Sequence, residues 1–386
     1  MRYFFLVLSL AVVCCFTSCN KNQQSTHNIK ADELFQLHDS ILAHTEEYSD
    51  SVVIRYAKGL KVDYQSDGIH VYQSDGIHVY ICNPDPSLGK ANTEEFVITK
   101  PSKRFICTTA LQLGNFEVLG LEDRIVGMNS LKNLFSPKMK QQMADGTTVK
   151  IGKEGNFDLE TVIAAKPDYI FVSASKHGGF EALKEIGVPL ITHHGYKEIN
   201  PLGQAEWIKL IGLLTGETKR ANAVFADIER KYLTLKEEIQ ADTLHTPTVI
   251  SGRQIRDGWY IVGGKSYMAQ LFKDAGADYI MKDNEDSGGT TLDFEAVYAR
   301  GIKADFWQID GSYNGDFTLE SLAKEDERYT SMDAYKNQKV LFCNFAQTPY
   351  RELAGVQPHY VLADFAKAFH PDVLPNYEPK FYKLIK

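Results

Sequence analysis

The sequence predicts an α/β protein with two lobes. From residue 103 onward, short apolar runs typical of strands alternate with helical patterns, and this alternation indicates parallel sheets. A long, uninterrupted amphipathic helix lies between two such regions. A similar sequence pattern, here called the repeated phrase, occurs once in each region. We therefore expect two Rossmann-like lobes with mostly parallel central sheets, joined by one long backbone helix and preceded by an N-terminal β-hairpin extension.

The connecting helix is expected within the stretch from Gly203 to Asp242. A first helical stripe ends at Thr215-Gly216, a signal for a left-handed cap. A second helix has no Pro or Gly from Thr218 to Gln240, with apolar residues on one face and charged residues on the other. At 1.5 Å per residue it is roughly 34 Å long. We interpret it as a rigid linker; the alternative is a surface helix of one large domain.

The other elements follow in a regular order on both sides of this helix. Before it we expect strands at 105–108, 125–128, 169–173 and 190–193, and helices at 111–119, 158–166 and 180–186. After it we expect strands at 248–251, 306–309 and 340–344, and helices at 266–275, 294–300 and 360–369. The repeated phrase begins at Asp158 and Asp293. It has an Asp N-cap, an apolar residue, a Glu, an apolar helix and an Asp before a strand.

The region before residue 100 contains a perfect tandem repeat. Residues 64–71 are followed by the same sequence at 72–79, inside a predicted strand–turn–strand unit. Because the repeat length is even, it keeps the two faces of a strand in phase. We expect it to add a second Ser-Asp-Gly turn, to lengthen a surface hairpin and to leave His70 and His78 exposed.

The N-terminus has the features of an export signal. Arg2 precedes an apolar run that is too short to span a membrane. The segment ends in Phe16-Thr17-Ser18-Cys19, which resembles a bacterial lipobox, in which the cysteine receives a diacylglycerol before cleavage. A plain secretory peptide is the alternative. We expect lipidation at Cys19, and a location in the periplasm with a lipid anchor to a bacterial membrane.

These patterns divide the chain into segments. We expect a signal peptide at 1–18, a tether at 19–31, an N-terminal lobe at 32–216 with its hairpin extension at 48–100, a linker helix at 217–243 and a C-terminal lobe at 244–386. The net charge of −8 argues against a nucleic-acid partner, which would need clustered Lys and Arg.

The sequence shows neither a metal centre nor a catalytic set. Cys82, Cys107 and Cys343 lie in strand-like apolar runs without zinc-ligand spacing, so we expect buried thiols and leave one disulfide open. His193 and His194 are adjacent in a predicted strand and point to opposite faces, which argues against one shared ion. Gly263-Gly-Lys-Ser lacks the first glycine of a phosphate loop. We therefore expect no enzyme, no cofactor and no bare metal.

Several segments together resemble the periplasmic solute-binding proteins of ABC importers, in the group that binds ferric siderophores, haem and cobalamin. They include 104–127, 152–170, 183–189, the linker helix and 263–277, and the likeness covers about residues 100 to 370. Their order and spacing carry the resemblance. It implies a ligand held between two lobes, little movement of the lobes because the helix is stiff, and membrane subunits of an importer as partners. We expect a monomer.

The expected ligand is a metal chelate, with a ferric siderophore first. Cobalamin or another corrinoid, and haem, are the alternatives within the same group. A different alternative is an extracytoplasmic enzyme on a two-lobed fold, although no catalytic set is recognisable. A surface-binding lipoprotein without a transporter is a further one.

The resemblance gives two glutamates a role. In that group, one exposed Glu on each lobe pairs with Arg residues of the membrane subunits, and Glu160 and Glu295 occupy matching places in the repeated phrase. Two fixed carboxylates would define the docking orientation. The alternative is that the helix dipole alone favours a Glu in the first helical turn.

Ligand contacts are expected from loops at the strand ends that face the other lobe. The candidates are Thr108, Thr109, Lys153 and Lys176 in the first lobe, and Arg253, Trp259, Tyr260, Tyr350 and Arg351 in the second. Aromatic rings would stack on a flat anionic chelate and guanidinium groups would bind its oxygens. The alternative for each basic residue is a solvated loop charge.

Overall fold

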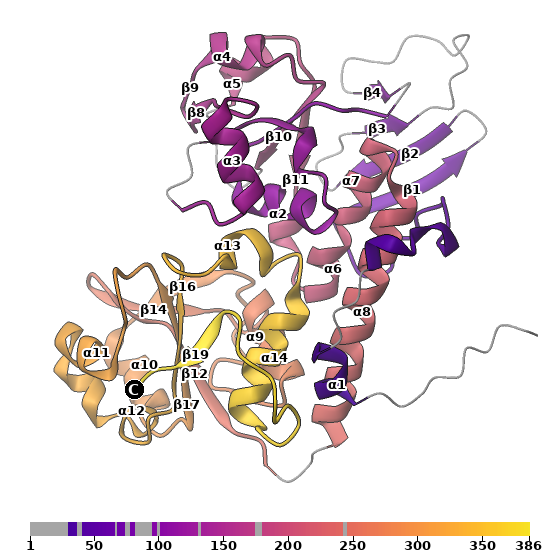
Figure 1. Ribbon diagram of the computed structural model, residues 1–386. Helices are drawn as coiled ribbons and strands as arrows, with labels where there is room; N and C mark the ends of the chain where they lie inside the picture. The colour runs from indigo at the N-terminus through magenta and orange to yellow at the C-terminus, as the bar shows by residue number, and fades with distance from the viewer. Residues whose placement is uncertain are drawn as a thin grey trace, which may run out of the picture.

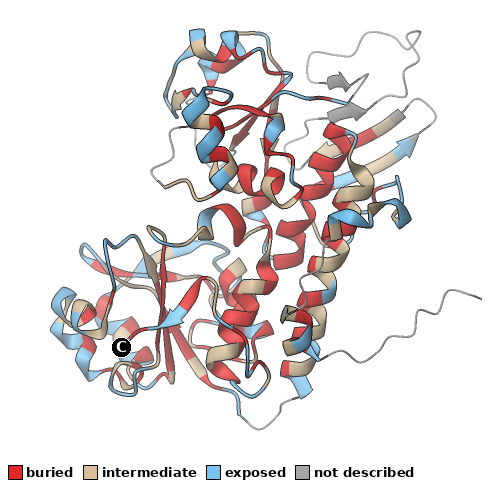
Figure 2. Cartoon of the chain, in the orientation of Figure 1, coloured by how far each residue is buried: buried red, intermediate tan, exposed pale blue. Residues whose placement is uncertain are grey.

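A computed structural model describes residues 30–36, 41–65, 68–73, 78–81, 95–98, 101–129, 133–173, 180–241 and 245–386 (Figure 1). The predicted signal peptide, Cys19, Cys82 and Lys176 lie outside these residues. Two lobes, each with its own sheet, lie along one side of a long helix, as predicted. Figure 2 shows the buried residues gathered in the two sheets and along the helices between them.

The N-terminal lobe has a five-stranded, fully parallel sheet in the order β11-β10-β5-β6-β7. Its strands are β5 (Phe105–Cys107), β6 (Ile125–Met128), β7 (Val149–Lys150), β10 (Tyr169–Ser173) and β11 (Leu190–His193). Its helices are α2 (Ala110–Val118), α3 (Pro137–Asp145), α4 (Leu159–Ala164) and α5 (Glu181–Lys184), and a short hairpin pairs β8 (Gly152–Lys153) with β9 (Asn156–Phe157).

The C-terminal lobe has a five-stranded sheet in the order β15-β12-β17-β18-β19, in which only β19 is antiparallel. The strands are β12 (Thr248–Ser251), β15 (Asp278–Tyr279), β17 (Phe306–Gly311), β18 (Val340–Asn344) and β19 (Tyr382–Leu384). Its helices are α9 (Tyr267–Asp274), α10 (Phe294–Gly301), α11 (Leu319–Glu325), α12 (Asp333–Lys336), α13 (Tyr350–Leu353) and α14 (Pro358–Phe369). A second, antiparallel sheet of β13 (Arg253–Ile255), β14 (Gly258–Val262) and β16 (Gly289–Leu292) was not predicted.

Three consecutive helices connect the lobes. They are α6 (Pro201–Glu206), α7 (Ile208–Thr215) and α8 (Thr218–Ala241). Gly216 ends α7 with φ of 75°, the left-handed conformation that the sequence predicted. The predicted apolar face of α8 is buried, and the helix packs against both α7 and α14. The long linker helix is therefore confirmed.

The repeated phrase has the same structural role in both lobes. Asp168, before β10, accepts hydrogen bonds from the backbone N–H groups of Lys103 (2.9 Å) and Arg104 (3.0 Å), which lead into β5. Asp305, before β17, accepts hydrogen bonds from the N–H and hydroxyl of Thr248 (2.8 Å each), which begins β12. Each carboxylate thus fixes the starts of two neighbouring parallel strands, which explains why an aspartate recurs at this place.

The tandem repeat forms separate strands and does not lengthen one hairpin. β1 (Leu60–Gln65), β2 (Gly68–Gln73) and β3 (His78–Ile81) pair antiparallel in sequence order, and β4 (Glu95–Ile98) pairs parallel to β3. The second copy covers the end of β2 and the start of β3, so the repeat spans three strands of a four-stranded sheet. The expectation that His70 is exposed was wrong, because its side chain is only 7% exposed within this sheet.

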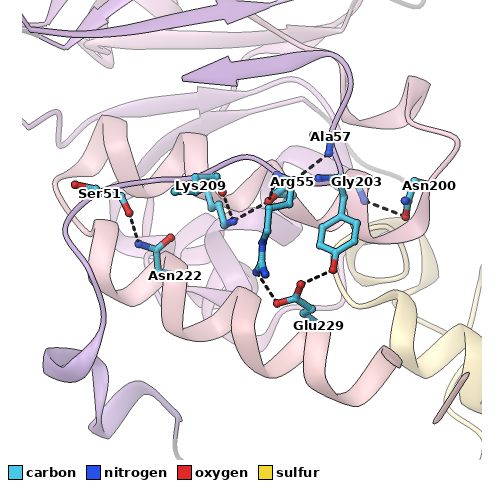
Figure 3. A network of polar contacts seen from close by, with 11 residues as sticks. Ser51, Arg55, Ala57, Asn200, Gly203, Lys209, Asn222 and Glu229 are labelled. Carbon is cyan, nitrogen blue, oxygen red and sulfur yellow. Dashed lines mark hydrogen bonds and ion pairs between the residues drawn. The ribbon is translucent and has the colours of Figure 1, made fainter. Parts of the chain in front are cut away.

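A segment of residues 51–59, here called the strap, runs along the connecting helices (Figure 3). The fully buried carboxylate of Glu206 accepts hydrogen bonds from the backbone N–H groups of Arg55 (3.0 Å), Tyr56 (2.7 Å) and Ala57 (2.9 Å). The buried ammonium of Lys209 donates to the same carboxylate and to the Val53 carbonyl, both at 2.7 Å. A buried charge is stable only when it is paired and hydrogen-bonded, and here the hydrogen-bonding partners come from the strap, α6 and α7.

Further contacts hold the strap, and the residues before it, against α8. Arg55 and the Tyr56 hydroxyl both contact the Glu229 carboxylate, and Asn222 donates to the carbonyls of Ser49 and Ser51. Farther along α8, the Ala31 N–H at the start of α1 (Ala31–Gln36) donates to Glu238. The N-terminal segment is thus held along the length of α8.

Two of the predicted cysteines can be placed. Cys107 and Cys343 are both buried free thiols, and burial raises the pKa of each well above its ordinary value.

Within the part of the chain that the structure describes, no helix combines the length and apolar character needed to cross a bilayer.

We predict that Glu206→Ala destabilises the protein by about 3–5 kcal/mol, because it leaves the buried Lys209 ammonium and three backbone N–H groups without their acceptor. Urea unfolding followed by circular dichroism measures the loss. Glu237→Ala, at an exposed position of α8, is the matched control and should change stability by no more than about 0.5 kcal/mol. Equal effects of the two substitutions would contradict the role assigned to Glu206.

Candidate ligand site between the lobes

The carboxyl ends of the two parallel sheets face each other across the lobe junction. The loop after β6 contacts residues that follow β18 in the other lobe. Asn133 donates its side-chain amide to the Phe345 carbonyl (3.1 Å), and the Phe135 N–H donates to the Glu352 carboxylate (2.8 Å). Ligands of open α/β sheets bind beyond the carboxyl ends of the strands. We therefore treat the segments after β5, β6, β12, β17 and β18 as the candidate site, called here the inter-lobe face.

On the N-terminal lobe, Gln112 holds the loop after β5. Its side-chain oxygen accepts hydrogen bonds from the N–H groups of Thr108 (2.7 Å) and Thr109 (3.0 Å). Its amide donates to the Val172 carbonyl of β10 (3.0 Å). Thr109 in turn caps α2. The structure thus places both threonines at the inter-lobe face, but their polar groups already stabilise the loop, and Thr108 is only 5% exposed.

On the C-terminal lobe, Asn344 plays the corresponding part. This buried residue ends β18, and its side-chain oxygen accepts hydrogen bonds from the N–H groups of Tyr313 (3.1 Å) and Ala346 (3.0 Å). Its amide donates to the Tyr313 carbonyl (2.9 Å). The loops after β17 and β18 are therefore tied to each other. The sequence analysis missed both Gln112 and Asn344 as organising residues of the site, because an amide side chain carries no motif.

Two of the predicted arginines lie near one carboxylate. Asp310, at the end of β17, is half-buried, and burial raises its pKa; the charges of Arg253 and Arg351 oppose this rise. Arg253 forms an ion pair with Glu325 (2.6 Å), whereas among the described residues Arg351 has no carboxylate within ion-pair distance. The guanidinium of Arg351 lies 4.8 Å from the centre of the Phe345 ring. Residues 98 positions apart in the chain are thus brought to one place, and Asp310 and Phe345 were not predicted.

The predicted tyrosines differ in exposure. Tyr260 is 41% exposed and lies opposite Arg253 in the pairing of β13 and β14, so both side chains belong to one face of that sheet. Tyr350 begins α13 and packs edge-on against Phe381 and Tyr382, with a tilted contact to Phe345. Tyr260 is the more available of the two rings for a ligand.

The expectation that Trp259 stacks on a ligand is wrong for this structure. Its side chain is fully buried, its indole N–H donates to the Ser251 carbonyl (2.9 Å), and it packs against Trp307, Phe294 and Tyr329. Successive residues of a strand point to opposite faces. Since Tyr260 faces outward, the adjacent Trp259 faces the core.

Lys153, one of the two predicted lysines, does not join this group of residues. Lys153 is exposed on the β8–β9 hairpin next to α4, and no contact places it with the arginines. Lys176 lies outside the described residues.

The two glutamates proposed for docking are both exposed, in the first turns of α4 and α10. Asp158 caps the first helix through the Thr161 N–H (3.0 Å) and Asp293 caps the second through the Ala296 N–H (2.9 Å). Figure 1 shows α4 and α10 on the side of the molecule away from α8, one in each lobe. Glu295 forms an ion pair with Arg328 (3.1 Å) at the surface.

Carboxylates also meet at the lobe junction. Glu117 of α2 lies near Glu352 of α13, and each has one buried oxygen without a hydrogen-bond partner among the described residues. Burial, followed by the charges of Glu352 and Glu122, raises the pKa of Glu117 to about 7, although Lys380 opposes the rise. Burial likewise raises the pKa of Glu352. The two helices approach so closely that a Cβ on Gly114 would meet the Glu352 carbonyl.

The inter-lobe face carries groups that can bind negative charge. It offers guanidinium groups, aromatic edges and the N-terminus of α2, all of which favour negative charge. Among the described residues, no group of three His, Cys, Asp or Glu side chains is placed to hold a metal ion. Two lobes that face each other through their strand ends, joined by one long helix, define a two-lobed ligand-binding protein.

The chain belongs to the periplasmic binding protein family, whose sequence profile matches residues 106–346, more than half of the chain. Among curated proteins it is similar to an uncharacterized lipoprotein of Methanocaldococcus jannaschii, 25% identical over 315 residues that cover 78% of this chain and 73% of that protein. The family and this lipoprotein relative support a location outside the cytoplasm.

Solved structures share the fold at low sequence identity. One is a periplasmic heme-binding protein of Pseudomonas aeruginosa, with a TM-score of 0.56 and 19% identity over 72% of this chain and 95% of that chain. Another is an ABC-type Fe3+-hydroxamate transport system protein of Saccharomonospora viridis, with a TM-score of 0.55 and 15% identity over 70% and 94%. These likenesses establish the fold that the sequence resemblance implied.

We predict that Glu117→Gln changes the pH dependence of stability. A carboxyl group with a raised folded pKa stabilises the folded state below its unfolded pKa of about 4.5, and this contribution is lost as the pH rises through about 7. The variant cannot ionise, so its melting temperature relative to wild type should rise between pH 5 and pH 8, on the order of 2 °C. Thermal scans at both pH values test this. Glu160→Gln, at an exposed position, should show no such change.

Proposed function

We propose that this protein captures an anionic metal chelate at the inter-lobe face and delivers it to the membrane subunits of an ABC importer. A ferric siderophore is the first candidate. The observation that carries the proposal is that the Arg253 guanidinium lies against Gly311 at the carboxyl end of β17, while the charges of both Arg253 and Arg351 act on the neighbouring Asp310. This pair lies in the lobe opposite Thr108 and the N-terminus of α2.

Charge distinguishes the candidate ligands. A ferric siderophore with carboxylate or hydroxamate oxygens presents several acceptors to the guanidinium groups, and Tyr260 and Phe345 offer rings beside them. A haem would bring two carboxylates to the same groups, and a corrinoid depends more on aromatic contacts. The loss of Trp259 from the exposed set weakens the corrinoid alternative, because it removes the largest ring from the face.

Delivery requires recognition by a transporter. Glu160 and Glu295 are supported as docking residues by their exposure, by their equivalent caps and by their placement on the side away from α8. A pair of fixed carboxylates on two lobes sets the orientation of a partner that carries complementary arginines. Glu295 would exchange its surface ion pair with Arg328 for one with the partner.

We predict that Arg351→Ala and Arg253→Ala each weaken ligand binding by about 10- to 100-fold, the range that corresponds to loss of a charge-assisted hydrogen bond. Tryptophan and tyrosine fluorescence during titration with ferric siderophores, cyanocobalamin and hemin measures the affinity. Arg300→Ala, an exposed position of α10, is the matched control and should bind as wild type does.

The titration also decides among the ligands. Saturable quenching by one of the three chelates, lost in both arginine variants, supports the proposed site. Binding that neither arginine substitution alters would place the ligand elsewhere, and quenching by none would reject a chelate of these classes.

We predict that Glu160→Ala combined with Glu295→Ala lowers chelate uptake at least tenfold and leaves chelate affinity unchanged, because neither carboxylate lies at the inter-lobe face. Uptake in cells that carry the cognate transporter and fluorescence titration of the purified variant are compared. The control is Glu320→Ala combined with Glu237→Ala, two exposed glutamates that belong to neither α4 nor α10. Unchanged uptake in the docking variant would reject these residues as the transporter contacts.

A further inference from the structure

A cavity, here called the hinge pocket, lies where the lobes, the strap and α8 come together. Its volume is about 590 Å³, within the range of about 300–1,000 Å³ typical of small-molecule sites. Its walls are strap residues 56–59, residues 194–202 of the N-terminal lobe, residues 232–236 of α8 and part of α9 in the C-terminal lobe. None of its lining residues belongs to the inter-lobe face.

The carboxylates of this wall are already engaged. Glu198 accepts hydrogen bonds from the N–H groups of Lys58 (3.0 Å) and Gly59 (2.8 Å) and from the Trp207 indole (3.2 Å). Asp274 accepts a hydrogen bond from the Tyr232 hydroxyl (2.6 Å), and its other partners are Lys236 (2.8 Å) and Gln270 (2.9 Å). Three donors thus hold each carboxylate in place; Lys236 neutralises Asp274, whereas the donors to Glu198 are neutral N–H groups.

Two ammonium groups of the wall lack such partners. Lys58 and Lys197 are exposed, and among the described residues neither has a carboxylate within ion-pair distance. They stand on different segments, the strap and the loop before α6. Two unpaired cations beside a concave surface raise the local concentration of anions.

The rest of the wall is largely apolar. Ile199 is 39% exposed, and Leu202, Leu233 and Tyr56 complete an apolar side of the pocket. Figure 3 shows Asn200, another wall residue, at the start of α6 beside the strap, where its side-chain oxygen caps the helix through the N–H groups of Leu202 (2.9 Å) and Gly203 (3.4 Å). An apolar side next to the ammonium groups of Lys58 and Lys197 fits a molecule that carries both an apolar body and an anionic head.

We propose that the hinge pocket is a second ligand site, which binds a small organic anion with a carboxylate or phosphate head and an apolar body. Lys58 and Lys197 bind the head, and the surface around Ile199 and Leu233 takes the body. Because the walls come from both lobes, an occupant favours one orientation of the lobes over others. This site does not depend on the identity of the chelate at the inter-lobe face.

The test uses calorimetric titration of the mature chain with Cys19→Ser, which prevents lipidation. Octanoate and octyl phosphate are the two probes, and octanol and inorganic phosphate supply the body and the head alone. We expect both probes to bind at least tenfold more tightly than octanol or inorganic phosphate. If only one probe binds, its head identifies the source of the anion as a carboxylate or a phosphate.

Lys58→Ala combined with Lys197→Ala should raise the dissociation constant of the probes at least tenfold. Lys303→Ala combined with Lys324→Ala, two exposed lysines of the C-terminal lobe, is the matched control and should leave it unchanged. Arg253→Ala combined with Arg351→Ala should also leave it unchanged, which separates this site from the inter-lobe face. Binding of neither probe, octanol binding as tight as octanoate, or no effect of the Lys58/Lys197 variant would overturn the proposal.

Discussion

The buried ion pair of Glu206 and Lys209 is the contact on which the hinge depends. The Glu206 carboxylate accepts hydrogen bonds from three backbone N–H groups of the strap, and the Lys209 ammonium donates to the Val53 carbonyl. Neither charge is stable at this depth without those partners. The strap, which lies before the residues matched by the family, is therefore part of the unit that joins the lobes, and it also supplies one wall of the hinge pocket.

Each lobe uses a buried amide to shape its half of the inter-lobe face. Gln112 fixes the loop after β5, and Asn344 fixes the loops after β17 and β18. The strand starts at the opposite edge are fixed by Asp168 and Asp305. Polar side chains thus order both ends of each sheet.

Much of the fold could be predicted, because local sequence patterns indicate the helices and strands of each lobe. Several features depend only on residues that are close together in the sequence. These are the apolar stripe of α8, the cap at Gly216 and the repeated phrases that begin at Asp158 and Asp293. The candidate site was predicted only in part. Arg253, Tyr260 and Arg351 were found from residue type and position, whereas Trp259 was assigned to the wrong face, because two adjacent aromatic residues in a short strand leave the phase undecided.

The sequence by itself determined the two lobes, their linker helix and the loops that carry charge, since these depend on periodicity and capping between near neighbours. Tertiary structure alone decided that Arg253 and Arg351 lie near Asp310, and that Glu117 lies near Glu352 across the junction. These pairings join segments far apart in the chain. Their geometry is set by how whole sheets and helices pack, which no local pattern records.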